Sequence, residues 1–142
     1  MEISDVRKRV KAAIDLSRRA AAERRTRADE AAREYDTFLA EIGVPLLRQI
    51  ASVLRAEGYL FTLFTPSESV RLMSDRSGDD YIELALDTTG PQPQVVGYAS
   101  HSRGHRVLKF ETPLGEGRPI RDLTEEDVLV FALKAVEPFV ER

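Results

Sequence analysis

Apolar residues recur every three or four positions over residues 1–42, which predicts one long helix in this segment. At 100° per residue they stay within a sector of roughly 80° around the helix axis, and the segment contains neither Gly nor Pro. The stripe has large side chains at both ends and only Ala and Ser in the middle. It consists of Ile3, Val6, Val10, Ile14, Ser17, Ala21, Ala28, Ala32, Tyr35, Leu39 and Ile42. One face of the helix is therefore expected to be buried.

A second helix is predicted directly after the first. Gly43 is expected to end the long helix, because glycine often follows the last turn of a helix. Pro45 suits the first turn of another helix, which is predicted over residues 44–57, before Gly58. Its apolar face consists of Leu46, Leu47, Ile50, Val53 and Leu54.

From Tyr59 onward the hydrophobic period changes from helical to two, which is typical of strands. Short turns rich in Gly, Pro, Ser and Asp separate the strands, so successive strands are expected to pair as an antiparallel meander. Ile82, Leu84 and Leu86 alternate with more polar neighbours, which predicts a sheet buried on one face. The five predicted strands are Tyr59–Thr65, Ser69–Ser74, Tyr81–Asp87, Gln94–Ser100 and Arg106–Glu111.

A last helix is predicted after Thr124, which is a suitable N-cap and is followed by three acids. Its apolar residues are spaced three and four apart as far as Phe139, and Pro138 marks the end. The sequence therefore predicts an α+β fold in one domain, residues 1–142. A long protruding or dimerising helix over 1–42 precedes a part over 44–142, which contains the second helix, a five-stranded antiparallel meander and a C-terminal helix packed on the sheet.

The length of the first helix is the main indication of function. It would span roughly 60 Å, whereas the ~100 residues after it form a body about 30–35 Å across. We therefore predict a homodimer, because a twofold contact uses one surface of the chain twice, and a non-catalytic role as a protein-interaction or adaptor module. The residues predicted to form the contact are Ile3, Val6, Val10, Ile14, Ala21, Ala28, Ala32, Tyr35 and Leu39.

The long helix is also divided by charge, although the net charge of the chain is only −3. Residues 7–27 hold nine Arg or Lys and two acids, while residues 28–41 hold one Arg and five acids. Two antiparallel helices would set the basic half of one against the acidic half of the other. In the alternative interpretation, the helix folds against its own sheet and is supported by ion pairs between residues four apart.

The basic residues permit a second function, nucleic-acid binding by a nucleoid-like or regulatory protein. Four cations lie within roughly 40° of one another beside the apolar stripe and would contact phosphates: Arg7, Lys11, Arg18 and Arg25. Counterion release would make such binding dependent on salt. However, the sequence has no recognition-helix pattern and no zinc-finger spacing. A solvated helix face explains the same charges.

Catalytic chemistry has little support in the sequence. The chain has no Cys, which excludes disulfides and thiolate catalysis, and it contains no catalytic motif, so we predict no cofactor and do not classify it as an enzyme. His101 and His105 flank a predicted turn and could approach one metal ion. Two ligands do not complete a zinc site, which takes three or four, so histidines that merely tolerate a turn are the simpler interpretation.

A third function would be small-ligand binding in a pocket between sheet and helices, lined by aromatic side chains. The candidates are Tyr59, Phe61, Phe64, Tyr81, Tyr98 and Phe110, although aromatic residues on strands more often belong to the core. The sequence shows no run of 18 apolar residues, so we expect no contact with a membrane and a cytoplasmic protein. Arg outnumbers Lys 17 to 4 and Asn is absent, which is typical of a bacterial source.

Overall fold

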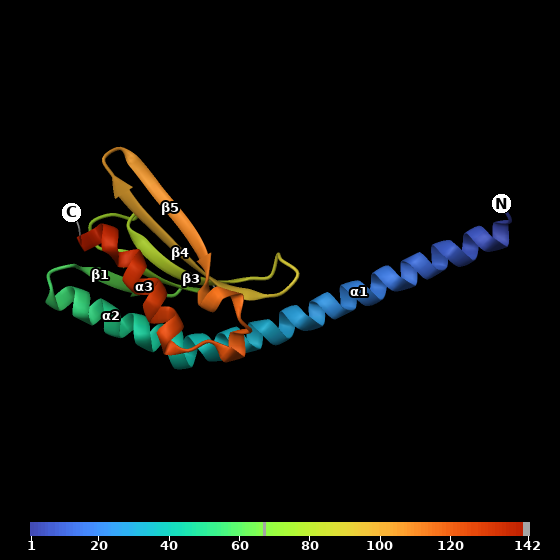
Figure 1. The fold of residues 1–142 in the computed structure, drawn as a ribbon, viewed down its shortest axis with the longest axis horizontal. Coiled ribbons are helices and arrows are strands. Elements are labelled where there is room, and N and C mark those ends of the chain that lie inside the picture. Colours follow the sequence, from blue (N-terminus) through green and yellow to red (C-terminus); the bar gives the residue numbers. More distant parts are fainter. Residues whose placement is uncertain (67, 141–142) are drawn as a thin grey trace.

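A computed structural model describes residues 1–66 and 68–140 of the chain. It confirms the predicted α+β fold: a long N-terminal helical region, an open five-stranded antiparallel sheet and a C-terminal helix (Figure 1). The helices are α1 (Ile3–Phe38), α2 (Val44–Ala56) and α3 (Glu125–Val140). The strands are β1 (Phe61–Phe64), β2 (Ser69–Ser74), β3 (Tyr81–Asp87), β4 (Gln94–Arg103) and β5 (Arg106–Pro113).

The predicted helix break at Gly43 is wrong. A π-helical turn, Leu39–Gly43, joins α1 to α2, and Gly43 itself has helical backbone angles of φ −61° and ψ −55°. Pro45 has no N–H, and its ring crowds the carbonyl four residues earlier. A π turn widens the helix just before that position, so the chain bends and continues (Figure 1). Gly43 is buried instead, and a Cβ there would lie 3.1 Å from Leu39 Cδ2.

The sheet is a meander in the order β1-β2-β3-β4-β5 with every neighbouring pair antiparallel. The structure confirms the predicted bounds of β2 and β3, but β4 and β5 are longer than expected. β5 begins at Arg106 as predicted and is longer at its far end, where Thr112 and Pro113 pair with Gly97 and Val96 of β4. The extension of β4 comes from the tightness of the hairpin. Only Gly104 and His105 connect the two strands, and Gly104 takes the left-handed φ of +64° that glycine adopts without strain.

One face of the sheet forms the core together with α2, α3 and the C-terminal part of α1. The central contacts come from Val70 and Leu72 of β2, Ile82 and Leu84 of β3, and Phe131 of α3. Gly97 of β4 has no side chain because the Phe131 ring occupies that space: a Cβ on Gly97 would lie 2.4 Å from Phe131 Cε1. The close approach of α3 to β4 therefore depends on this glycine.

The continuous helix is also relevant to membranes. In the part of the chain that the structure describes, Ile3–Ala56 is long enough, and over one window apolar enough, to cross a membrane. That window is the poorly charged stretch around α2, which supplies Leu47 and Leu54 to the core. Because core helices pass the same test, the feature is weak evidence for a membrane span.

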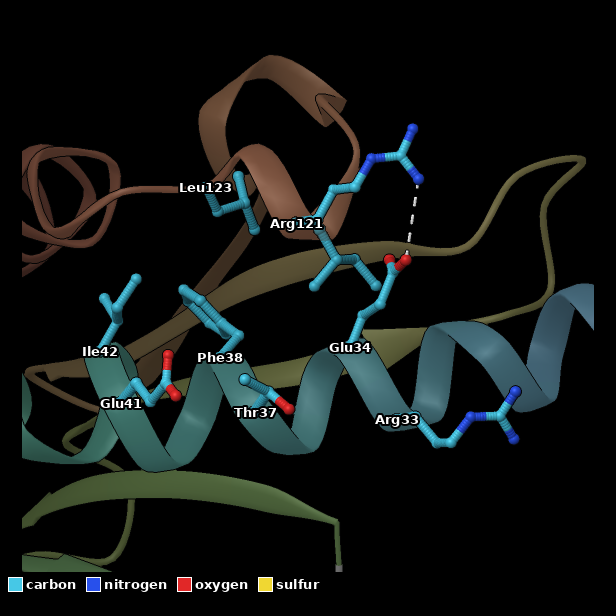
Figure 2. Close-up of a pocket in the computed structure, with 9 residues that line it drawn as sticks. Arg33, Glu34, Thr37, Phe38, Glu41, Ile42, Arg121 and Leu123 are labelled. Carbon is cyan, nitrogen blue, oxygen red and sulfur yellow. Dashed lines mark ion pairs between the residues drawn. The ribbon is translucent and has the colours of Figure 1, made fainter.

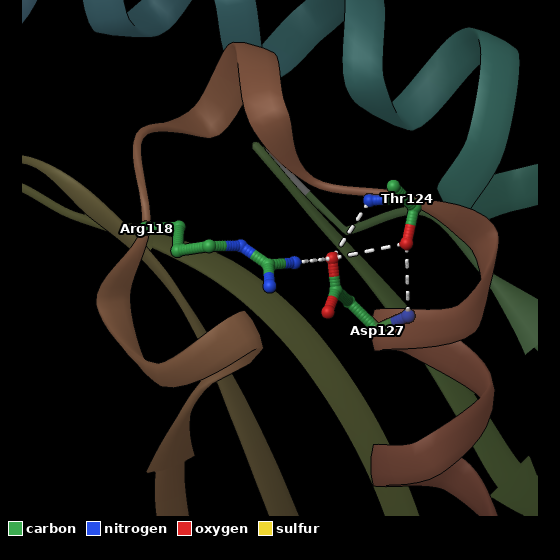
Figure 3. A network of polar contacts seen from close by, with 3 residues as sticks. All are labelled: Arg118, Thr124 and Asp127. Atoms are coloured by element: carbon green, nitrogen blue, oxygen red, sulfur yellow. Dashed lines mark hydrogen bonds and ion pairs between the residues drawn. The ribbon is translucent and has the colours of Figure 1, made fainter.

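The first turn of α3 is fixed by the capping arrangement that the sequence predicts, with Asp in the place of Glu (Figure 3). The carboxylate of Asp127 accepts a hydrogen bond from the backbone N–H of Thr124 at 2.8 Å, and the Thr124 hydroxyl oxygen accepts one from the Asp127 N–H at 3.4 Å. Arg118 forms an ion pair with the same carboxylate. Burial alone would raise the pKa of Asp127, but these hydrogen bonds outweigh burial and lower it.

Replacing Gly97 by Ala tests the packing of α3 on β4. The new methyl group must displace the Phe131 ring, so Gly97→Ala is expected to lower the free energy of unfolding by about 1–3 kcal/mol. The measurement is urea unfolding followed by circular dichroism. Gly78→Ala is the matched control, because its Cβ would be 4.0 Å from the nearest atom outside the adjoining residues, Met73 Sδ. Equal stability of the two variants would contradict the packing argument.

Replacing Asp127 by Asn tests the capping network. The pKa of Asp127 is lowered in the folded state from its ordinary value of 3.8, so its stabilising effect is present above that pH and is lost as the pH falls through the lowered pKa. At pH 7 the variant is expected to lose about 1 kcal/mol of stability. The difference from the parent protein should shrink below pH 3.8, as measured by urea unfolding. Asp122→Asn removes a carboxylate outside this network and is the control, with a free energy of unfolding at pH 7 expected close to that of the parent protein.

Candidate functional site

The N-terminal part of α1 leaves the body of the protein and makes no contribution to its core. No residue from 3 to 27 is buried, and the first core residue of the helix is Ala31. We call residues 3–27 the arm; at 1.5 Å per residue it is about 37 Å long. Figure 1 shows it projecting well beyond the sheet, with the N-terminus at its far end.

The root of the arm is firmly held. Phe38 and Ile42 face Leu123 across a groove of about 330 Å³, which Ile120 also lines (Figure 2). The hydroxyl of Tyr35 donates a hydrogen bond of 3.2 Å to the backbone carbonyl of Leu84. Burial, and then the charge of Glu83, raise the pKa of the Tyr35 phenol, so it remains a donor at neutral pH. The arm therefore projects from an anchored helix.

An ion pair completes the anchor. Arg121 Nη1 lies 3.8 Å from Glu34 Oε1 and bridges the groove at its rim. Both side chains are substantially exposed, so the pair adds little to stability. The apolar contacts beneath it hold the helix.

The structure divides the predicted dimerisation residues into two groups. In the arm, Ile3, Val6, Val10 and Ile14 are 79, 43, 52 and 44% exposed, which is unusual for a continuous aliphatic stripe. Ala21 and Ala28 are half-buried and Ala32 is exposed. Tyr35 lies in the core and Leu39 packs against it. Ala32 lies between Ala31 and Tyr35, which are both buried, so the stripe is clear of the core only as far as Ala28.

This division argues against the pairing suggested by charge alone, in which residues 7–27 of one helix lie against residues 28–41 of the other. A partner helix laid along the stripe over residues 28–42 would occupy the space of the protein's own core, which already covers Ala31, Tyr35 and Phe38. The basic half of one helix therefore cannot lie on the acidic half of another along this stripe. A contact along the stripe has to lie within the arm.

The arm also carries a shallow hollow that sequence reasoning did not identify. It has a volume of about 470 Å³ and is lined by Val10, Ala13, Ile14, Ser17, Arg18 and Ala21. The hollow exists because small residues follow large ones along the stripe, so the surface drops between them. In the sequence, the run of Ala and Ser in the middle of the stripe was the signal for this hollow. The run indicated that another helix could approach closely, and the structure shows where on the arm the hollow lies.

Charges border the stripe differently on its two sides. On one side, and within roughly 40° of one another, lie the cations predicted to contact phosphates; Arg7, Lys11, Arg18 and Arg25 are all exposed. The other side has mixed signs, contributed by Glu2, Asp5, Arg9, Glu23 and Arg27. Residues 1–27 together hold nine cations and four acids, a net charge of +5, while the rest of the chain carries −8.

The structure does not bring the two histidines together. His101 is opposite Leu108 in the β4-β5 ladder, while His105 lies in the turn. The His101 ring instead meets the Phe139 ring edge-on, with 6.4 Å between ring centroids. Among the described residues, no group of three His, Asp or Glu side chains could hold a metal ion.

The aromatic residues expected to line a ligand pocket are not gathered in one place. Phe61 belongs to the core, where its ring centroid lies 5.2 Å from that of Phe139. Tyr81 and Tyr98 lie on the opposite face of the sheet, where Tyr81 stacks beneath the Arg71 guanidinium at 4.2 Å. Tyr59 and Phe61 line one pocket of about 280 Å³ together with Phe139, whereas Phe110 lines a different one. The six aromatic residues therefore do not line one common pocket among the described residues.

Comparison of the chain with protein-family models, curated proteins and solved structures finds no match. Function therefore has to be argued from the surface itself. In the described structure, the large side chains of the apolar stripe of the arm are exposed and belong to no part of the core.

Proposed function

We propose that the protein is a non-catalytic homodimeric interaction module whose two arms pair antiparallel. The observation that carries the proposal is the exposed stripe of Ile3, Val6, Val10 and Ile14 on an anchored helix. Exposing four large aliphatic side chains in a row is unfavourable, and a second copy of the chain supplies a matching stripe at the same concentration. A helix alone in water is only marginally stable, and a helix in a protein gains most of its stability from packing its apolar face.

The free stripe fixes the register of the pair. It extends from Ile3 to Ala28, so its midpoint lies between residues 15 and 16. A twofold axis there sets three of the four large N-terminal side chains of one arm against small residues of the other. Ile3 then faces Ala28, Val10 faces Ala21 and Ile14 faces Ser17, while Val6 lies opposite Arg25. Alternating large and small residues across an interface is how helices fill the space between them.

Two further observations support this register. The hollow on the arm is centred on the same midpoint, because its lining residues are distributed evenly about it. The tip of each arm would also stop near Ala28 of its partner, where the partner's stripe passes into its own core. The arms therefore overlap along their free length without either tip meeting the other sheet domain.

The resulting dimer holds two identical sheet domains at opposite ends of the paired arms. Such an arrangement is bivalent: a partner with two binding sites gains affinity once the spacing of the two domains matches it. This property, rather than chemistry at a catalytic centre, is the function that the geometry supports best.

Replacing Ile14 by Gln tests the stripe. Each dimer loses two copies of Ile14, each worth about 1.5–3 kcal/mol when fully buried, so the dissociation constant is expected to rise by about 100-fold or more. Gln is a good helix former and leaves the charge unchanged. The measurement is sedimentation equilibrium, with circular dichroism as a check of helix content.

Leu16→Gln is the matched control for that experiment. Leu16 is 68% exposed and follows Ile14 by two residues, so it points away from the stripe. Its replacement should leave the dimer intact. A parent protein that is monomeric at 100 µM, or a dimer weakened equally by both substitutions, would contradict the proposal.

Exchanging Val10 and Ala21 tests the register. Val10→Ala opens a gap at the interface and Ala21→Val adds a methyl group opposite each Val10, so each single variant is expected to weaken the dimer by at least tenfold. The double variant restores one large and one small residue in each pair, so most of the affinity should return. Sedimentation equilibrium of all four proteins gives the coupling. Strictly additive losses would exclude this register while leaving the dimer itself in place.

A further inference from the structure

The symmetry of the proposed dimer gathers charge at one edge. A twofold axis perpendicular to two antiparallel helices keeps equivalent flanks on the same side of the pair. The flank formed by Arg7, Lys11, Arg18 and Arg25 of one arm therefore lies beside the same flank of the other. We call these eight side chains the basic edge of the dimer.

The basic edge has few acids to balance it. Asp15 follows Lys11 by four residues and precedes Arg18 by three, and Asp29 follows Arg25 by four, so each helix sets two acids beside its four cations. The edge of the dimer therefore keeps an excess of four positive charges. In the proposed register, Arg7 approaches Arg25 of the second copy and Lys11 approaches Arg18. Like charges so placed oppose pairing. An anion lying along the edge would remove that repulsion.

The average density of the cations matches that of the phosphates in a nucleic acid. The cations lie in two rows, one on each arm, with successive cations about 6–10 Å apart by helical rise. Together, eight cations over about 27 Å average roughly one per 3.4 Å, which is the axial spacing of phosphates along one DNA strand. A duplex is also straight over this distance, because its persistence length is about 150 base pairs. An acidic polypeptide would first have to become ordered, which costs entropy. A nucleic-acid duplex is therefore the anionic partner that fits best.

We infer that the basic edge of the paired arms binds the phosphate backbone of a nucleic-acid duplex. This inference rests on the proposed dimer, because one arm alone offers half of the cations. The binding is independent of base sequence, since the edge presents no side-chain pattern for reading base edges in a groove. Because the duplex binds the paired arms more tightly than a single arm, duplex binding stabilises the dimer, and dimerisation raises the affinity for the duplex.

Salt dependence is the quantitative signature of this surface. If all eight cations engage phosphates, the slope of log K against log salt concentration is about −7. Replacing Arg18 and Arg25 by Gln leaves four cations in the dimer, so the slope should fall to about −4 and the affinity at low salt should drop by tenfold or more. Arg48→Gln with Arg55→Gln, on exposed positions of α2, is the matched control and should change neither quantity appreciably.

The experiment measures fluorescence anisotropy of a labelled 24-base-pair DNA of mixed sequence with the full chain, between 50 and 300 mM NaCl. Sedimentation of the same proteins reports dimerisation separately. The expected result is a dimer that binds the duplex with the steep slope and loses it in the Arg18/Arg25 variant alone. Ile14→Gln, as a weakened dimer, should bind with about half the slope.

Four outcomes would overturn the inference. Absence of duplex binding at 50 mM NaCl by a dimeric protein removes it but leaves the proposed function standing. Equal losses in the Arg18/Arg25 and Arg48/Arg55 variants place the binding elsewhere. Preference for labelled polyglutamate over DNA assigns the edge to an acidic polypeptide instead. A parent protein that stays monomeric with DNA present removes both proposals.

Discussion

Burial of the C-terminal part of α1 against the sheet determines the position of everything else in this molecule. The helix enters the core at Ala31, Tyr35 and Phe38. The apolar stripe continues along the helix beyond the point where the core ends. The same face of the same helix therefore serves the fold at one end and is left uncovered at the other. The arm is a direct consequence of a helix that is longer than the domain to which it is anchored.

Much of the fold could be predicted because local signals agreed with one another. The alternation of Ile82, Leu84 and Leu86 and the turn residues around them defined β3 and its neighbour β2, since a strand buried on one face leaves a clear period of two. Thr124 and the acids after it likewise predicted the start of α3, where Thr124 and Asp127 form the capping hydrogen bonds. Gly43 misled the prediction because a glycine that permits close packing looks the same in sequence as a glycine that ends a helix.

Less of the candidate site could be predicted. The periodicity identified the stripe, and its members from Ile3 to Ile14 are exposed as a contact surface requires. Periodicity does not say which part of a stripe a protein covers with its own sheet. Tyr35 and Leu39 were therefore predicted to contact a partner, although they pack within their own chain. The two histidines show the same limit: their register depends on a two-residue hairpin, which places His101 opposite Leu108.

The absence of a loop between the arm and the buried part of α1 makes the arm a lever. A flexible linker would let the sheet domain turn freely, whereas a continuous helix carries any rotation of the domain to the tip. The pivot lies where the helix leaves the core, at Ala31, because Ala31, Tyr35 and Phe38 hold the helix to the sheet. From Ala31 to Ile3 is roughly 42 Å, so a tilt of the anchored segment by about 10° would move the tip by about 7 Å. Small shifts in how this segment packs against the sheet are thus magnified far from the core.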